Sequence, residues 1–96
     1  MPENQYKDKY TNGYFISENK NVVLRMSAIN SMIYTQSDID IDPDERYSDL
    51  YINGFCVGSV LNNDKVKKLF IDKLLEFVDR NESVSFEYIE ELLNLK

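Results

Sequence analysis

Apolar and polar residues alternate strictly in one stretch near the middle of the chain, where two isoleucines separate three aspartates. A period of two is typical of a β-strand with one apolar and one polar face. At a rise of roughly 3.3 Å per residue, the aspartates of such a strand stand in a row about 6.6 Å apart. Pro43 then ends the strand, because it cannot donate to a ladder, and two further acids follow it. This acidic ridge consists of Asp38, Asp40, Asp42, Asp44 and Glu45.

The clearest turn signal in the chain is Asn53-Gly54, which lies between mainly apolar stretches at 47–52 and 55–60. Asn-Gly is the preferred pair for a two-residue type I′ hairpin, because both central residues need a positive φ. We therefore predict two antiparallel strands, and Gly58 in the second one indicates a bulge or the close approach of a helix. The polar face of the first strand carries Tyr47, Asp49 and Tyr51.

The N-terminal half contains three further predicted strands, one of them ambiguous. Residues 1–12 are polar without a clear period, and we expect a loose arm there. One strand is predicted at 14–17 and a long one at 32–41, which carries the aspartates of the acidic ridge. Between them, apolar residues alternate but also fit a helical stripe, so that strand and helix both remain open for residues 22–33. The β-branched residues favour a strand.

The C-terminal third of the chain changes to a helical period. One helix is predicted from an N-cap at Asn62 to about Arg80, with Asn81 as its C-terminal stop. A second, shorter helix is predicted from Ser85. The residues expected to face the core are Val66, Leu69, Phe70, Leu74, Phe77 and Val78 in the first helix and Phe86, Ile89, Leu92 and Leu93 in the second. The acids expected to face solvent are Glu87, Glu90 and Glu91.

This order of elements, with strands first and helices second, predicts an α+β fold. We expect a four- to five-stranded antiparallel sheet, a meander with the Asn-Gly hairpin, and two C-terminal helices packed on one face. The chain of 96 residues suits a single domain, 1–96. Within it we expect the arm at 1–12, the sheet at 13–60 and the helices at 61–96.

Charge and composition narrow the classes of function. The net charge of −6 opposes binding to nucleic acid or to an anionic membrane, which both depend on Lys and Arg. Histidine, the commonest general base and metal ligand, does not occur in the sequence. The single cysteine, Cys56, lies in a predicted strand, and we expect it to be buried and structural. We therefore expect a cytoplasmic, non-catalytic protein with no cofactor, no metal, no signal peptide and no membrane span.

Three interpretations of the acidic ridge compete. A calcium loop of the EF-hand type would begin at Asp38, but its sixth position is Pro43, where the sharp turn requires glycine. Acids on a long strand also prevent edge-to-edge aggregation and keep a protein soluble. In the third interpretation, the row of carboxylates occupies a basic groove evolved for DNA or RNA, with Tyr47 and Tyr51 as aromatic anchors.

In its size, its element order and its clustered acids, the chain resembles small acidic phage-encoded inhibitor proteins of the anti-CRISPR and DNA-mimic type. This resemblance implies stoichiometric inhibition of a nuclease or another DNA-binding protein, through the Arg and Lys residues that read DNA. The expected partner is a protein with a basic surface. The residues expected to bind it are Asp38, Asp40, Asp42, Asp44, Glu45, Tyr47, Asp49, Tyr51, Glu87, Glu90 and Glu91. An alternative function is a small homo-oligomeric regulatory or adaptor protein that binds through an apolar or tyrosine-rich face.

Overall fold

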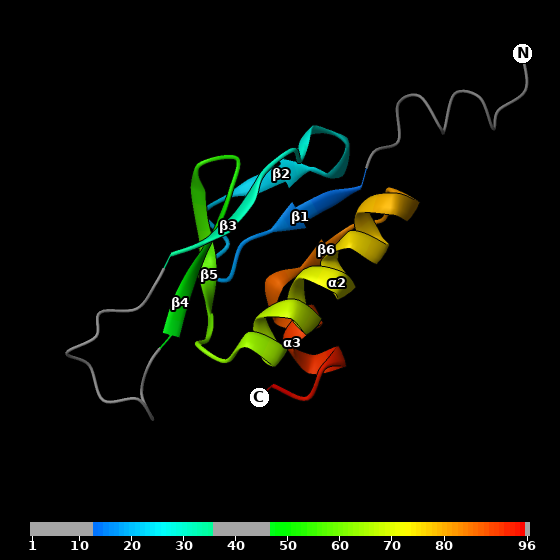
Figure 1. Ribbon diagram of the computed structural model, residues 1–96. Helices are drawn as coiled ribbons and strands as arrows, with labels where there is room; N and C mark the ends of the chain where they lie inside the picture. The colour runs from blue at the N-terminus through cyan, green and yellow to red at the C-terminus, as the bar shows by residue number, and fades with distance from the viewer. Residues whose placement is uncertain (1–12, 36–46, 96) are drawn as a thin grey trace, which may run out of the picture.

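The computed structural model describes residues 13–35 and 47–95. The fold is α+β (Figure 1), and the strands do not all precede the helices, because one short strand lies between the two helices. In chain order the described elements are β1 (Tyr14–Ile16), β2 (Val23–Arg25), the 3-10 helix η1 (Met26–Ala28), β3 (Met32–Tyr34), β4 (Tyr47–Ile52), β5 (Phe55–Leu61), α2 (Asp64–Arg80), β6 (Val84–Ser85) and α3 (Phe86–Leu92).

The described strands form two three-stranded sheets. In sheet A, of order β2-β1-β6, β1 pairs antiparallel with β2 and parallel with β6. In sheet B, of order β3-β4-β5, both pairs of neighbours are antiparallel. The expected single sheet of four or five strands is therefore not confirmed. The difference arises because β1 pairs with β6, a two-residue strand far along the chain that has no periodic signal of its own.

The Asn-Gly hairpin between β4 and β5 is confirmed. Asn53 and Gly54 have φ values of 52° and 86°, the positive values that a type I′ turn requires. The register of the pair shifts between Leu50 and Tyr51, which marks an irregularity opposite Gly58. A Cβ atom on Gly58 would lie 2.5 Å from a ring carbon of Phe86. Gly58 thus combines the two predicted roles, since the strand is irregular there and α3 approaches it closely.

The ambiguous segment 22–33 is neither one long strand nor an α-helix. The strand β2 has only three residues and gives way to the single 3-10 turn η1. Met26 in this turn is almost fully buried, and its backbone N–H donates to the carbonyl of Gly13 at 2.8 Å. The next strand, β3, ends at Tyr34, and the rest of the predicted strand, residues 36–41, lies outside the described residues.

Helix α2 begins one residue later than predicted. Its N-cap is Asn63, whose side-chain oxygen accepts two backbone N–H groups of the first turn, at 3.0 and 3.2 Å. Asn62, the predicted cap, instead accepts hydrogen bonds from Ser48 Oγ at 2.9 Å and from Lys67 Nζ at 3.1 Å. A sequence pattern cannot separate two adjacent asparagines, because both have the side chain that a cap needs.

The predicted end of α2 is confirmed. The helix ends at Arg80, and Asn81 follows in the left-handed conformation with a φ of 54°. Phe70 and Leu74 are fully buried, but Leu69, which we expected to face the core, is 42% exposed. The buried stripe of α2 is therefore narrower than the one predicted from the apolar residues.

The second helix, α3, is capped by Ser85 as predicted, and the Oγ atom of Ser85 accepts the backbone N–H of Tyr88 at 3.1 Å. Phe86 and Ile89 are fully buried. Leu92 faces outward rather than inward and is 43% exposed. Among the described residues, no helix combines the length and the apolar character needed to span a membrane.

The hydrophobic core joins both sheets to both helices. The helices α2 and α3 lie together on one side of the molecule, and sheet B lies opposite them (Figure 1). The rings of Phe70 and Phe86 meet in this core with centroids 4.6 Å apart. The buried hydrophobic residues are Phe15, Met26, Leu50, Ile52, Val57, Val60, Phe70, Leu74, Val84, Phe86 and Ile89.

Candidate interaction surface on sheet B

Sheet B has one buried face and one open face. Along β4 the side chains alternate, so that Leu50 and Ile52 are fully buried while Asp49 and Tyr51 lie on the other side. Cross-strand pairing extends this open side over β3 and β5. We call it the outward face, and its three rows are Ile33–Tyr51–Cys56, Thr35–Asp49–Ser59 and Tyr47–Leu61. The three predicted β4 residues, Tyr47, Asp49 and Tyr51, therefore share one surface, as the alternation predicts.

The position of Cys56 differs from the one predicted from the sequence. We expected a buried structural residue, but Cys56 is exposed. Cys56 pairs with Tyr51, which lies on the outward face, and the register shift beyond this pair turns Val57 into the core instead. The sequence could not show this difference, because a register shift changes which of two adjacent apolar residues is buried.

Ser59 holds two carboxylates at the edge of this surface. Its hydroxyl donates to Asp49 Oδ1 at 2.6 Å, and its backbone N–H donates to Glu18 Oε1 at 3.1 Å. The backbone N–H of Glu18 in turn donates to the carbonyl of Val57 at 2.7 Å. Glu18 thus covers this part of the outer edge of β5 and places a second acid beside the outward face. Glu18 and Ser59 were not among the predicted site residues.

A shallow pocket of about 440 Å³ lies beside this edge and is lined by Glu18, Tyr47, Ser59, Glu90 and Leu95. Tyr47 is 57% exposed at its mouth. Glu90, which we expected to face solvent, is instead buried, with 9% of its surface exposed. The pocket therefore brings together two predicted site residues, Tyr47 of β4 and Glu90 of α3.

The other two acids of α3 do not line this pocket. Glu91 is exposed, as expected, and Glu87 is half-buried. Within the described ranges 13–35 and 47–95, no group of three acidic or cysteine side chains is arranged to hold a metal ion. The described surface therefore offers carboxylate acceptors and aromatic side chains, which suit contacts with Arg and Lys.

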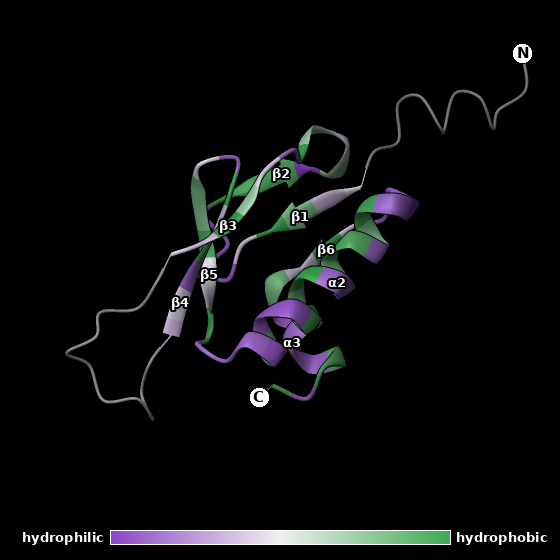
Figure 2. Cartoon of the chain, in the orientation of Figure 1, coloured by the Kyte–Doolittle hydropathy of each residue, from purple (hydrophilic) through white to green (hydrophobic). Residues whose placement is uncertain are grey.

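Charges are distributed differently on the outward face and on α2. The outward face contains no Lys or Arg among its eight residues, and its charged group is Asp49. On α2, hydrophilic residues lie at both ends of the helix (Figure 2), and four of its five basic side chains lie within 4 Å of an acid. The α2 ion pairs are Lys67–Asp64 at 3.9 Å, Lys68–Asp72 at 2.8 Å, Lys73–Glu76 at 3.2 Å and Arg80–Glu76 at 3.3 Å.

The acidic ridge itself, Asp38, Asp40, Asp42, Asp44 and Glu45, lies outside the described residues. In the sequence it connects Thr35 to Tyr47, and both of these residues belong to the outward face. Residues 36–46 contain five acids and one arginine, so most of the net charge of −6 lies in this segment. The acids of the ridge are therefore joined covalently to one end of the outward face.

Tyr34 ties β3 to α2 from the inner side of the sheet. Its hydroxyl donates to the backbone carbonyl of Lys67 at 3.0 Å, and the Lys67 ammonium lies 5.4 Å from the centre of its ring. Burial raises the pKa of the Tyr34 hydroxyl well above its ordinary value, because the phenolate would lose its hydration. Tyr34 is therefore a structural tyrosine, unlike Tyr47 and Tyr51.

Comparison with known proteins does not assign the chain to a family. No family model, no curated protein and no solved structure matches it.

Proposed function

We propose that the protein is a non-catalytic inhibitor that binds the basic, nucleic-acid-binding site of a nuclease or another DNA-binding protein through an acidic surface. The surface consists of the outward face of sheet B together with the acidic ridge. The observation that carries the proposal is the contrast in charge. Three of the four acids of α2 pair with lysine or arginine, whereas the outward face has an acid and no basic residue.

The chemistry of this surface favours a partner rich in Arg and Lys. Carboxylates form strong, charge-assisted hydrogen bonds with guanidinium and ammonium groups, and Arg binds them through two parallel bonds. Asp49 is already held in place by Ser59, so that little side-chain freedom is lost when a partner binds. The exposed Tyr47 provides an aromatic surface next to the acids, as is common at the centres of interfaces.

An inhibitor of this kind would be encoded by a phage or another mobile element and would act in the cytoplasm of the host cell. It would need neither a cofactor nor catalytic residues, because it would occupy the site that DNA or RNA normally occupies. Electrostatic attraction would also accelerate the encounter between the two proteins.

The test is a pull-down from a bacterial lysate at low and at high salt, followed by a competition assay. The variant replaces three ridge acids, Asp40→Asn, Asp42→Asn and Asp44→Asn. The matched control removes the same number of negative charges from α2, with Asp64→Asn, Asp72→Asn and Asp79→Asn. We expect wild type and control to retain a nucleic-acid-binding protein at low salt, the ridge variant to lose it, and DNA to compete with the bound inhibitor.

Two results would contradict this function. If the ridge variant and the control retain the partner equally, the acids of the ridge do not carry the binding. If the partner is retained at high salt by all variants, the interface is apolar, because screening weakens only the electrostatic contribution. The second result would favour the adaptor that binds through an apolar or tyrosine-rich face.

A further inference from the structure

The far edge of β3 has backbone groups that no described residue binds. In a pair of antiparallel strands, the backbone N–H and C=O groups of one residue point toward the partner strand, and those of the next residue point away from it. Thr35 donates to the carbonyl of Asp49 and Asn53 donates to the carbonyl of Ser31, so that Ser31, Ile33 and Thr35 bond toward β4. The N–H and C=O groups of Met32 and Tyr34 therefore point to the opposite edge, where no hydrogen bond from a described residue reaches them.

Two other edge strands of the described sheets, β5 and β2, carry features that discourage pairing with another chain. At the edge of β5, Glu18 occupies the carbonyl of Val57 and the N–H of Ser59. The strand β2 contains the exposed, charged Arg25. The strand β3 has the sequence Met-Ile-Tyr, with no charge, proline or bulge. Proteins commonly protect a free edge with one of these features, so an unprotected edge indicates a pairing site.

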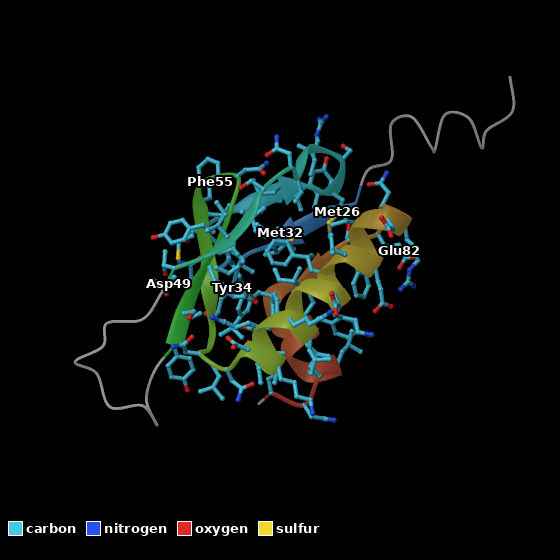
Figure 3. All side chains as sticks on the ribbon, in the orientation of Figure 1. Met26, Met32, Tyr34, Asp49, Phe55 and Glu82 are labelled. Carbon is cyan, nitrogen blue, oxygen red and sulfur yellow. The ribbon has the colours of Figure 1, made fainter. Side chains whose placement is uncertain are left out.

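Space is available beside this edge. A hollow of about 210 Å³ lies between Met32 and the α2 residues Leu75 and Val78. The side chains of Met32 and Tyr34 extend from the inner side of β3 toward α2 (Figure 3). Ile33 lies on the outward face and is 61% exposed, the largest exposed fraction among the exposed large hydrophobic side chains of the described residues.

We propose that the edge of β3 binds the same edge of a second copy of this chain, in antiparallel orientation around a twofold axis at Ile33. One register satisfies the four N–H and C=O groups of Met32 and Tyr34 that no described residue binds. In this register Met32 of each copy is opposite Tyr34 of the other, and each of these two pairs exchanges two hydrogen bonds. Ile33 then faces Ile33 of the second copy at a non-hydrogen-bonded position, where side chains approach most closely.

The outward face also becomes continuous in this arrangement. The row Ile33–Tyr51–Cys56 of one copy is extended by the same row of the other, across six strands. This pairing covers the exposed Ile33 on both copies and thereby removes its apolar surface from water. A short extended segment of another protein could satisfy the same backbone groups, but only a second copy also places an isoleucine against Ile33 by symmetry.

Charge selects the antiparallel orientation. The residues that follow Thr35 include the five acids of the ridge and only Arg46 as a base. In a parallel pair the two Thr35 residues, to which these acidic segments are joined, would lie side by side, and the segments would repel each other. In the antiparallel pair these attachment points lie at opposite ends of the two β3 strands, so that the repulsion is smaller. This dimer is inferred from the edge of β3 and from Ile33, whereas the inhibitor function is inferred from the acids, so the dimer does not rest on the proposed inhibitor function.

Cysteine cross-linking tests the register directly. Residues that face each other at a non-hydrogen-bonded position have Cα atoms about 4.5 Å apart, which is within the range of about 4.4–6.8 Å for disulfides. We expect Ile33→Cys, in a Cys56→Ser background, to form a covalent dimer under mild oxidation. The matched control is Val23→Cys in the same background, because Val23 is an edge-strand residue of sheet A that is 57% exposed. The control should form no covalent dimer, because Val23 lies away from the proposed interface.

Sedimentation velocity over a wide concentration range tests whether the chain dimerises without a covalent cross-link. We expect the wild-type mass to rise from 11.3 kDa toward twice that value as the concentration increases. Met32→Pro removes an N–H group that points away from β4, and therefore leaves the ladder of sheet B intact. Ile33→Lys places a charge on the axis. Both variants should stay monomeric while they keep the wild-type circular dichroism spectrum, and Val23→Lys should dimerise like wild type.

Three results would overturn the proposal. The first is a wild-type mass that stays at the monomer value at every concentration. The second is an Ile33→Cys variant that cross-links no faster than the Val23→Cys control. The third is a dimer that persists in both Met32→Pro and Ile33→Lys, which would place the interface elsewhere. A monomeric wild type whose pull-down partner is lost in Met32→Pro would instead assign the edge to a strand of that partner.

Discussion

The two faces of sheet B belong to the same strands but are held by different forces. On the inner face, Leu50 and Ile52 are fully buried, and Gly58 allows the ring of Phe86 to pack directly on the backbone. On the outward face, Ile33 and Tyr47 are more than half exposed. The comparison shows that the inner face supplies the stability of this small domain. The outward face keeps much of its apolar and aromatic surface exposed to solvent.

The largest expected effect is on the inner face. Leu50→Ala should lower the free energy of unfolding by about 2–5 kcal/mol, because it removes buried methyl groups and leaves a cavity. Ile33→Thr on the outward face should change it by less than about 0.5 kcal/mol, because the side chain is mostly exposed. Urea denaturation at a concentration where the chain is monomeric measures both. Equal losses in the two variants would contradict the distinction between the faces.

A smaller loss is expected where α3 meets sheet B. Gly58→Ala places a Cβ atom within 2.5 Å of the Phe86 ring, so the buried ring must shift, at a cost of about 1–3 kcal/mol. A double-mutant cycle with Phe86→Leu separates this clash from any change in backbone preference. If the clash is the cause, Gly58→Ala should cost less in the Phe86→Leu background than in wild type. An unchanged cost in that background would place the cause in the backbone of β5.

The smallest expected effect is on the outward face. Ser59→Ala removes the donor that holds Asp49 at 2.6 Å, and we expect it to lower the free energy of unfolding by about 1 kcal/mol. The matched control is Thr35→Val, because the hydroxyl of Thr35 on the same face makes only a long contact of 3.4 Å with the carbonyl of Asp49. The control should be neutral in denaturant. If Ser59→Ala proved as costly as Leu50→Ala, this serine would be a core residue and not a surface one.

About half of the candidate site could be predicted from the sequence. Strict alternation placed Tyr47, Asp49 and Tyr51 on one face, because a strand has only two sides. Glu18 and Ser59 could not be predicted, since their contact joins the loop after β1 to the edge of a strand from the other sheet. Their separate positions in the sequence carry no periodic signal for this contact.

Glu90 illustrates the same limit on α3. Helical periodicity predicted that it faces solvent, together with Glu87 and Glu91. The structure buries it, with 9% of its surface exposed, at a pocket that it lines together with Tyr47, Ser59 and Leu95. A short amphipathic helix defines its apolar stripe clearly, but the neighbours that cover the flanks of the stripe belong to other parts of the chain.

The sequence by itself determined the elements that depend on local interactions. The positive φ values of Asn53-Gly54 define the hairpin. The side chain of Ser85 caps the start of α3, and the left-handed backbone of Asn81 ends α2. Only the tertiary structure decided that the strands divide into two sheets, that β1 pairs with β6, and that Cys56 is exposed. These outcomes depend on which distant segments pack together, and the free energy of that packing belongs to no single segment.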